Sequence, residues 1–268
     1  MTTELHTVID AVLKDLPTGG RVLVAVDGVD GSGKSTFALQ LCAHANERGI
    51  PIAVLSLDDF YFGRRERARL ARTVHPLLAT RGVPGTHDIA LLTRTLDALG
   101  HASVRVPARI PRFDKGADTR LPPSRWRRVS PPPRIVVLEG WCVGVPAQRA
   151  DALARAANAL ERHEDAQGDW RRFVNTQLRT VYEPVWRSLD SLTTLEAPAF
   201  SVVTRWRTEQ ERTLWKKRAP HAMDTAALAR FLMHYERLSR HALHTLPDRA
   251  DVRIVLDRNR DVRAIRVA

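Results

Sequence analysis

The sequence is poor in cysteine and has no long apolar run. Cys42 and Cys142 are its only cysteines, and neither belongs to a Cys-x-x-Cys pair or to a His/Cys cluster with metal-ligand spacing. This pattern excludes a disulfide framework and a structural zinc site, and it is typical of a reducing compartment. No stretch approaches the roughly 18 apolar residues of a membrane span, and the N-terminal residues do not resemble a signal peptide. We therefore expect a cytoplasmic protein without a membrane partner.

Acidic residues are scarce relative to basic ones. The chain has 42 Lys and Arg against 30 Asp and Glu, a formal net charge of +12. Such an excess suits a nucleic acid or a site that attracts phosphorylated ligands. However, the arginines are spread along the chain, with short clusters at 64–69, 125–128 and 216–218, and Trp126 is the single aromatic residue within these clusters, fewer than a strand-binding groove requires. Solvated surface arginines are therefore expected, and a nucleic-acid-dependent ATPase is the disfavoured alternative.

Strands alternate with helices along the 268 residues. Apolar, β-branched runs predict strands at 21–27, 52–57, 134–138, 199–203 and 251–257. Apolar residues at helical spacing predict helices near 3–16, 34–48, 87–99, 169–191, 205–218 and 224–244. The connecting stretch 62–86 is expected to be irregular, 107–133 is a polar and proline-rich connection, and 147–166 is expected to be a helix or a mobile excursion. This order predicts an α/β fold with a doubly wound, mostly parallel sheet.

The strongest functional signal follows the first predicted strand. Gly28-x-x-x-x-Gly33-Lys34-Ser35 joins an apolar strand to a helix, which is the context that a triphosphate-binding loop requires. The glycines let backbone N–H groups face phosphate oxygens, Lys34 adds a positive charge, and the Ser35 hydroxyl can join the shell of Mg²⁺. The expected nucleotide-binding residues are Gly28, Asp30, Gly31, Ser32, Gly33, Lys34, Ser35 and Thr36. Since no Asn-Lys-x-Asp segment is present to read guanine, ATP is expected rather than GTP.

Carboxylates follow two of the predicted strands. In open parallel sheets the ligand lies beyond the carboxyl ends of the strands, and Asp58 and Glu139 come directly after strands 52–57 and 134–138. Glu139 is expected to bind Mg²⁺ together with Ser35, with a cap of the next turn as the alternative. Asp58 is the favoured base for the proton of an attacking alcohol and a further candidate ligand of Mg²⁺, whereas Asp59 could only cap a turn.

Three segments taken together carry a family resemblance. The phosphate loop, residues 55–61 (LSLDDFY) and residues 138–141 (LEGW) resemble the P-loop kinases of the phosphoribulokinase, uridine kinase and pantothenate kinase group. This resemblance implies a P-loop kinase fold with a helical lid. It also implies that Asp58, which precedes the Phe-Tyr pair, is the catalytic base and that Lys34 acts beside it.

Further segments are similar to D-glycerate 3-kinases, over about residues 21–260. They are 81–88 (RGVPGTHD), 110–115 (IPRFDK), 206–211 (WRTEQE) and 223–235. The resemblance implies an acceptor-binding insertion over about 60–133 and a lid over about 205–222, in which Arg205 and Arg207 contact phosphate. It implies acceptor-binding roles for Tyr61, His87, Arg112, Asp114 and Lys115. The stretch 216–221 (KKRAPH) departs from the glycine-rich segment expected in such a lid.

The residues by themselves leave some of these assignments open. Arg112 and Lys115 flank Asp114, which suits a carboxylated or phosphorylated acceptor. His87 and Asp88 could instead belong to the start of the helix that follows. The basic residues of 205–218 could form an ordinary solvated helix face.

The prediction is a single domain over 1–268 that uses ATP and Mg²⁺ to phosphorylate an alcohol hydroxyl. D-glycerate or a similar small hydroxy acid is the expected acceptor. The same chemistry on a nucleoside, pantothenate, a sugar phosphate or a specialised metabolite is the alternative. A nucleotide-binding module without turnover is disfavoured because both Asp58 and Glu139 are present. The sequence does not define the oligomeric state.

Overall fold

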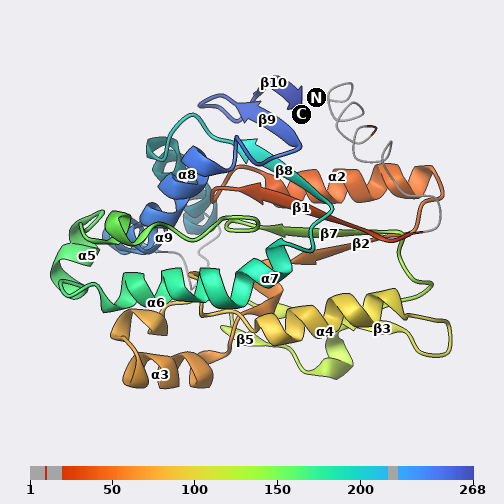
Figure 1. The fold of residues 1–268 in the computed structure, drawn as a ribbon, viewed down its shortest axis with the longest axis horizontal. Coiled ribbons are helices and arrows are strands. Elements are labelled where there is room, and N and C mark those ends of the chain that lie inside the picture. Colours follow the sequence, from red (N-terminus) through yellow and green to blue (C-terminus); the bar gives the residue numbers. More distant parts are fainter. Residues whose placement is uncertain (1–9, 11–19, 217–222) are drawn as a thin grey trace.

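The central element of the fold is a six-stranded sheet with the order β10-β9-β8-β1-β7-β2 (Figure 1). The computed structural model describes residues 10, 20–216 and 223–268. The strands are β1 (Val22–Gly28), β2 (Ile52–Ser56), β7 (Ile135–Gly140), β8 (Ser191–Glu196), β9 (Val252–Leu256) and β10 (Val262–Val267). Strands from β2 to β9 pair in parallel, and β10 is antiparallel to β9. The predicted mostly parallel sheet is therefore confirmed.

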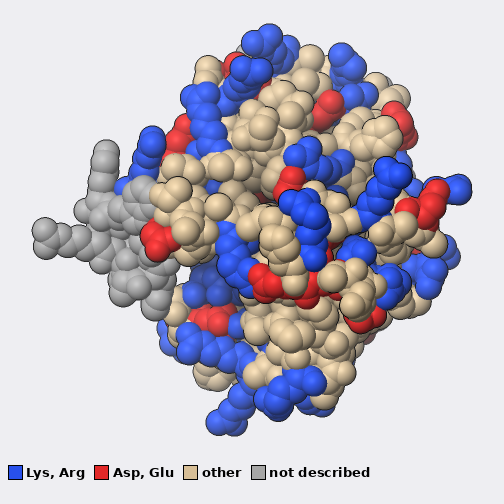
Figure 2. Space-filling view, turned by 90° about the vertical axis from the view of Figure 1, so that its left-hand side faces the viewer, with Lys and Arg blue, Asp and Glu red and all other residues tan. Residues whose placement is uncertain are grey.

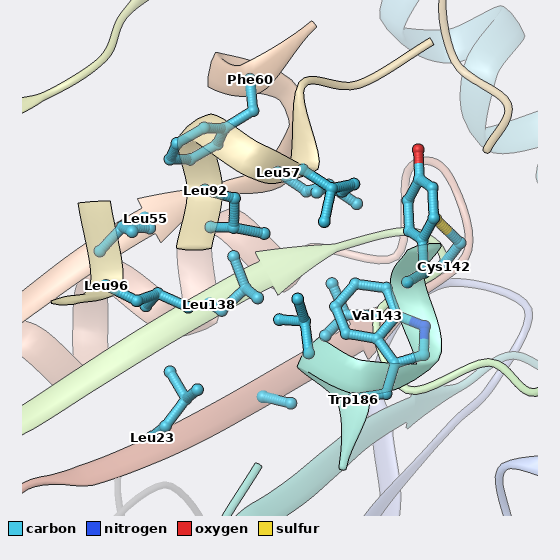
Figure 3. Close-up of a cluster of buried hydrophobic side chains, with 14 of the residues drawn as sticks. Leu23, Leu55, Leu57, Phe60, Leu92, Leu96, Leu138, Cys142, Val143 and Trp186 are labelled. Carbon is cyan, nitrogen blue, oxygen red and sulfur yellow. The ribbon is translucent and has the colours of Figure 1, made fainter. Parts of the chain in front are cut away.

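Helices cover both faces of this sheet. One cluster of buried side chains joins the sheet to α2 (Lys34–Glu47) and α8 (Ser201–Lys216). The cluster on the opposite face, part of which is drawn in Figure 3, brings Leu23 and Leu138 of the sheet against Leu92 and Trp186. These last two side chains come from α4 (Ile89–Gly100) and α7 (Glu183–Trp186). Because both faces are covered, β1 and β7 are buried along their whole length, which explains their continuous apolar runs.

Two more helices complete this arrangement. Helix α6 (Asp169–Gln177) leads through a π-helical turn, Leu178–Tyr182, into α7. Helix α9 (Thr225–Thr245) contributes side chains to both buried clusters. The π-helical turn and α7 pack on the same face of the sheet as α4, through Leu178, Tyr182, Val185 and Trp186 (Figure 1).

The chain between β2 and β7 forms a compact unit beside the sheet. It starts with a 3₁₀ turn, Leu57–Phe60, and contains α3 (Arg64–Thr73) and α4. It also holds two small antiparallel pairs: β3 (Ala108–Ile110) with β6 (Arg127–Val129), and β4 (Phe113–Asp114) with β5 (Thr119–Arg120). The expectation of an irregular stretch over 62–86 is wrong for α3. Its buried Arg67 pairs with Asp118 and donates to the carbonyls of Phe62 and Ala79, a tertiary anchor that local spacing does not reveal.

Two predictions near the carboxyl-terminal half are also wrong. The helix expected over 169–191 ends at Trp186, and the strand expected over 199–203 is instead the start of α8. The strand lies earlier, at β8, because the carboxylate of Asp251 accepts a hydrogen bond from the Leu192 N–H and fixes the start of that strand beside β9. Val202 and Val203 are buried, as expected for a strand, but they lie in the first turn of helix α8.

Of the remaining predicted helices and strands, some are confirmed and some lie where the structure does not test them. Helices near 34–48, 87–99 and 224–244 and strands near 21–27, 52–57, 134–138 and 251–257 are confirmed, while β10 was not predicted. Segment 147–166 contains a 3₁₀ turn, Ala150–Leu153, and the short helix α5 (Ala159–Glu164). The helix expected over 3–16 and part of the expected lid, 217–222, lie outside the described residues.

Charge is spread widely over the surface. Figure 2 shows Lys and Arg side chains over the whole face that it draws, with Asp and Glu among them. On this face the basic excess is thus not gathered into one groove. Within the described part of the chain, none of the helices is both long and apolar enough to cross a membrane.

Candidate active site

The loop between β1 and α2 has the backbone of an anion cradle. Gly31 and Gly33 adopt φ of 82° and 97°, a left-handed conformation that residues other than glycine rarely take. Gly33 caps α2, whose first residue is Lys34, so the positive end of the helix faces the loop. A Cβ atom on Gly31 would lie 2.9 Å from Cβ of Trp206 in α8. The glycine is therefore required both by its backbone angle and by the close packing of α8.

Polar groups without partners surround this cradle. The hydroxyl of Ser32 is buried and has no hydrogen-bond partner among the described residues. Asp27, which precedes Gly28 at the end of β1, is buried as well. Burial raises the pKa of Asp27 well above its usual value, against the opposing effect of Lys34. Such donors and acceptors are costly to bury without a partner, and they fit a loop that closes around a polar ligand.

The two arginines expected in the lid have different positions. Arg207 lies against the loop, with its Nε 3.6 Å from a carboxylate oxygen of Asp30, and it donates to Glu211 at 3.1 Å. Arg205 instead donates to Glu209 and to the side chain of Asn259, in the turn between β9 and β10. Arg207 is thus beside the phosphate loop, whereas Arg205 is held at the neighbouring hairpin.

Asp58 lies in the 3₁₀ turn that follows β2, within a set of charged and polar partners. Its carboxylate accepts hydrogen bonds from Nζ of Lys115 at 2.6 Å and from the Tyr61 hydroxyl at 2.9 Å. Burial by itself would raise the pKa of Asp58, but Lys115, Lys34 and the Tyr61 hydroxyl lower it to about 2. The carboxylate is therefore ionised at neutral pH and can accept a proton.

Asp59 has a different task from that of its neighbour. Its carboxylate accepts the backbone N–H of Phe113 at 2.9 Å and so ties the 3₁₀ turn to β4. Burial raises the pKa of Asp59, which is the opposite direction from Asp58. The two adjacent aspartates are thus distinguished by their partners.

One cavity of about 820 Å³ brings the phosphate loop and the carboxylates together. Ser35 at the start of α2, Asp58 after β2 and Glu139 in β7 all line it. The cavity is lined by Ser35, Leu39, Cys42, Val54, Ser56, Asp58, Asp59, Arg112, Phe113, Asp114, Lys115, Leu121, Arg127 and Glu139. The structure therefore places the expected metal-ligating and base residues on a single opening at the carboxyl edge of the sheet.

Three of the five expected acceptor residues line this cavity. They are Arg112, Asp114 and Lys115, which lie on or beside β4. The carboxylate of Asp114 accepts the backbone N–H groups of Gly116 and Ala117 at 2.9 and 3.0 Å, which shapes the turn that carries Lys115. Asp114 thus builds the turn, and Lys115 reaches from it to Asp58.

Tyr61 and His87 are instead buried behind Asp58. Their rings stack with centroids 4.4 Å apart, and neither is among the residues that line the cavity. The expectation that they line an acceptor pocket is therefore wrong for this cavity, because each is only 3% exposed. Asp88, next in the chain, caps α4 by accepting the N–H of Leu91 at 2.9 Å.

Tyr182 supports His87 and was missed in the sequence. Its hydroxyl accepts the N–H of Gly85 at 2.9 Å and lies 2.8 Å from Nδ1 of His87. The hydroxyl and Nδ1 share one hydrogen bond, while Nε2 of His87 is buried without a partner among the described residues. Burial lowers the pKa of His87 to about 3, so the ring is neutral. A tyrosine in a predicted amphipathic helix carries no local signal that it will contact a histidine so distant in sequence.

A second cavity, of about 340 Å³, lies on another side of the phosphate loop. Gly31, Ser32, Gly33 and Thr36 form one wall of it. Arg260 and apolar side chains from β9 and β10 form another wall: Ile254, Leu256, Val262 and Ile265. Phe37, Gln40, Leu195 and Gln210 complete the lining. This cavity offers an apolar surface next to the phosphate cradle and apart from Asp58.

The class of protein follows from this arrangement. Ser35, at the end of a glycine-rich loop, lines the same cavity as two carboxylates from neighbouring strands of a mostly parallel sheet. That combination is the architecture of a P-loop kinase.

Comparison with known proteins agrees with this class. The chain is 32% identical over 275 residues to a protein named uncharacterized kinase mug58 from Schizosaccharomyces pombe, covering 96% of this chain and 98% of that protein. It is 28% identical over 200 residues to chloroplastic D-glycerate 3-kinase from Arabidopsis thaliana, covering 71% of this chain and 41% of that enzyme. The chain belongs to the D-glycerate 3-kinase-like P-loop kinases. No protein-family model matches the sequence.

A solved structure shares the whole fold. D-glycerate 3-kinase from Cryptococcus neoformans superposes with a TM-score of 0.79 at 22% identity, over 98% of this chain and 99% of the other. At this identity the likeness concerns the fold, and the acceptor has to be argued from the site.

Proposed function

We propose that this protein is an ATP- and Mg²⁺-dependent kinase that transfers the γ-phosphoryl group to a hydroxyl of glycerate or a similar small hydroxy acid. The observation that carries the proposal is the shared cavity, in which Asp58 faces the end of the phosphate loop at Ser35. An alcohol bound there would lie between a carboxylate that can take its proton and the site of the phosphoryl donor.

The nucleotide has a consistent place on the loop. The N–H groups around Gly31 and Gly33 and the charge of Lys34 suit the β and γ phosphates. The apolar cavity lined by Thr36, Ile254 and Val262 suits the adenine and ribose. Arg207 is placed beside the loop to offset charge on the transferring group.

The donor set fits Mg²⁺ as a second cofactor. Ser35 and Glu139 line the same cavity, and in the described part of the chain no three His, Cys, Asp or Glu side chains converge. Mg²⁺ keeps several waters and binds one or two protein oxygens plus phosphate, so a hydroxyl and one carboxylate suffice. When bound, the ion would neutralise charge on the phosphates. Glu139 and Ser35 would hold it, and Asp58 would remain available for the acceptor hydroxyl.

The acceptor side favours an anion. Lys115 and Arg112 line the cavity on the side of Asp58, and both can pair with a carboxylate. Lys115 contacts Asp58 directly, so a carboxylate bound by Lys115 would bring its neighbouring hydroxyl close to the base. The 28% sequence identity to a protein named D-glycerate 3-kinase adds support for this class of acceptor.

An acceptor-dependent ADP-release assay tests the proposal. Purified protein with ATP and Mg²⁺ would be offered glycerate, a nucleoside, pantothenate and a sugar phosphate, and ADP would be measured for each. Glycerate or another small hydroxy acid is expected to give the largest kcat/KM. Release of ADP only with one of the other acceptors would keep the kinase chemistry and refute the acceptor class. No acceptor-dependent release with any of them would refute the function.

A further inference from the structure

The cavity that contains Asp58 extends well beyond it along α2. Ser35, Leu39 and Cys42 all line it, and their spacing of four and then three residues places them on one face of the helix. Seven residues of α-helix span about 10 Å. The opening therefore continues for nearly two helical turns away from the phosphate loop.

The facing wall follows the edge strand of the sheet. Ser56 and Val54 of β2 both line the cavity, and β2 is the last strand of the sheet on this side. The direction from Ser56 to Val54 leads away from Asp58 by about 7 Å. Since α2 follows β1 and precedes the parallel strand β2, it runs antiparallel to both strands, so the two walls extend in the same direction.

The chemistry of the walls changes along this direction. Next to Asp58 they are polar and charged, whereas Leu39, Cys42 and Val54 make the next part apolar. Leu39 is 64% exposed, the largest such value for any leucine or isoleucine in the described chain. A leucine so exposed on the wall of a ligand cavity can be covered when a ligand with an apolar segment binds.

A cation lies beside the apolar part. The guanidinium of Arg127, in β6, lines the cavity and donates to the backbone carbonyl of Val54 at 2.8 Å. This bond holds the side chain across the edge of β2. A guanidinium has five N–H donors, so Arg127 can hold its position and still meet an anion with its other edge.

We propose that Leu39, Cys42, Val54 and Arg127 form an arm subsite for the acceptor. It would take a hydroxy acid longer than glycerate, whose aliphatic arm lies on the three apolar residues and whose second anionic group pairs with Arg127. The inference rests on the proposed kinase function and narrows its acceptor class. A three-carbon acid is shorter than one turn of α2 and would leave this part of the cavity empty.

A matched set of acceptors tests the subsite by kinetics. 2-Hydroxyadipate carries an arm with a second carboxylate, 2-hydroxyhexanoate carries an arm of the same length without one, and glycerate has no arm. The kcat/KM for ADP release is expected to be about 10–100-fold higher with 2-hydroxyadipate than with 2-hydroxyhexanoate, the range of a charge-assisted pair. Equal values for the two would overturn the inference and leave the kinase function standing.

Two variants assign this selectivity to a residue. Arg127→Gln is expected to reduce the ratio of kcat/KM between 2-hydroxyadipate and 2-hydroxyhexanoate to near one. Arg128→Gln is the control. The side chain of Arg128 alternates to the other face of β6 from that of Arg127, and Arg128 is not among the cavity residues. A ratio that survives Arg127→Gln, or that falls equally in Arg128→Gln, would overturn the assignment.

Alkylation of Cys42 gives a readout that does not need turnover. Cys42 is partly exposed on the cavity wall, whereas Cys142 is fully buried and serves as the internal reference. 2-Hydroxyadipate is expected to slow modification of Cys42 by iodoacetamide at least several-fold, and glycerate much less. Protection of Cys42 by 2-hydroxyadipate in a protein that releases no ADP with any acceptor would support a binding subsite and refute the kinase function. Equal rates with and without 2-hydroxyadipate would overturn the subsite even in an active kinase.

Discussion

The phosphate side and the acceptor side of the cavity are built in different ways. The phosphate side is a continuous run from Gly28 to Ser35, and its donors are backbone groups whose direction is set by two glycines in left-handed conformations. The acceptor side gathers side chains from separate segments: Asp58 after β2, Lys115 beside β4, and Tyr182 from a π-helical turn.

Because of this difference, the two sides of the cavity should tolerate different substitutions. A backbone cradle depends on the absence of side chains, so any Cβ at the wrong position disturbs it. A cluster of side chains depends on several long-range contacts, and the loss of one partner changes the charge or position of the next. Substitutions on the first side should therefore affect nucleotide binding, and those on the second side should affect turnover and its pH dependence.

The largest effect is expected from Asp58→Asn. Asn keeps the shape of the side chain but cannot accept the proton of the attacking alcohol, so kcat should fall about 10²–10⁴-fold while ATP affinity is largely kept. Asp59→Asn is the matched control, since an amide oxygen can still accept the N–H of Phe113. Steady-state kinetics and ATP titration check both variants. A nearly normal rate for Asp58→Asn would remove that carboxylate from the mechanism.

Gly31→Ala is expected to act on the nucleotide side alone. The new Cβ would approach Trp206 to 2.9 Å at a backbone φ of 82°. Strain of about 1–3 kcal/mol, relieved by a shift of the loop, corresponds to roughly tenfold to hundredfold weaker ATP binding by calorimetric titration. Gly49→Ala is the control, because Gly49 also has a positive φ of 69° but nothing lies within 4 Å of its added Cβ. Equal losses in both variants would mean that the effect is general destabilisation.

Lys115→Met should change the pH dependence of turnover. Without Lys115, burial of Asp58 is opposed by fewer charges, so the pKa of Asp58 should rise from about 2. The base must be ionised to act, and the acid limb of kcat/KM should therefore move to higher pH by about 1 unit or more. Steady-state rates extended down to about pH 3 measure the shift, because the unchanged protein should keep its rate there and Lys115→Met should lose it. Arg109→Met, in β3 and outside the cavity lining, should leave the limb in place.

The smallest change in rate is expected from Tyr182→Phe. It leaves Gly85 N–H and His87 Nδ1 buried without this partner, which should lower the free energy of unfolding by about 1–3 kcal/mol. The rate should fall only a few-fold, because Tyr182 acts on Asp58 through His87 and Tyr61. Denaturant unfolding and ¹⁵N spectra of the His87 ring measure the two effects. Tyr235→Phe, which removes a single bond to the Arg81 carbonyl, is the comparison; an unchanged His87 tautomer in Tyr182→Phe would refute the positioning role.

The sequence predicted the phosphate side better than the acceptor side for a physical reason. The loop is specified by neighbours in the chain, so the glycine spacing, the apolar strand and the helix could be read directly. The positions of Asp58 and Glu139 at strand ends followed from the general geometry of parallel sheets. The resulting expectation of one cavity for Ser35, Asp58 and Glu139 matches the structure.

Contacts between distant segments could not be predicted in this way. The burial of His87 depends on Tyr182, and the place of α3 depends on the pairing of Arg67 with Asp118. The strand β8 was missed because the amphipathic pattern of α6 and α7 continues toward it, while its start is bonded to Asp251, just before the neighbouring strand β9. In each case a side chain far along the chain decides the local structure.

The bond between Arg127 and the carbonyl of Val54 also bears on how the molecule avoids self-association. A terminal strand such as β2 offers unpaired backbone groups to which a strand of another molecule could add. Arg127 occupies one of these acceptors and places a charge beside the strand. A strand of another molecule would have to displace this guanidinium to pair with β2 at Val54, which disfavours intermolecular β-pairing at that position.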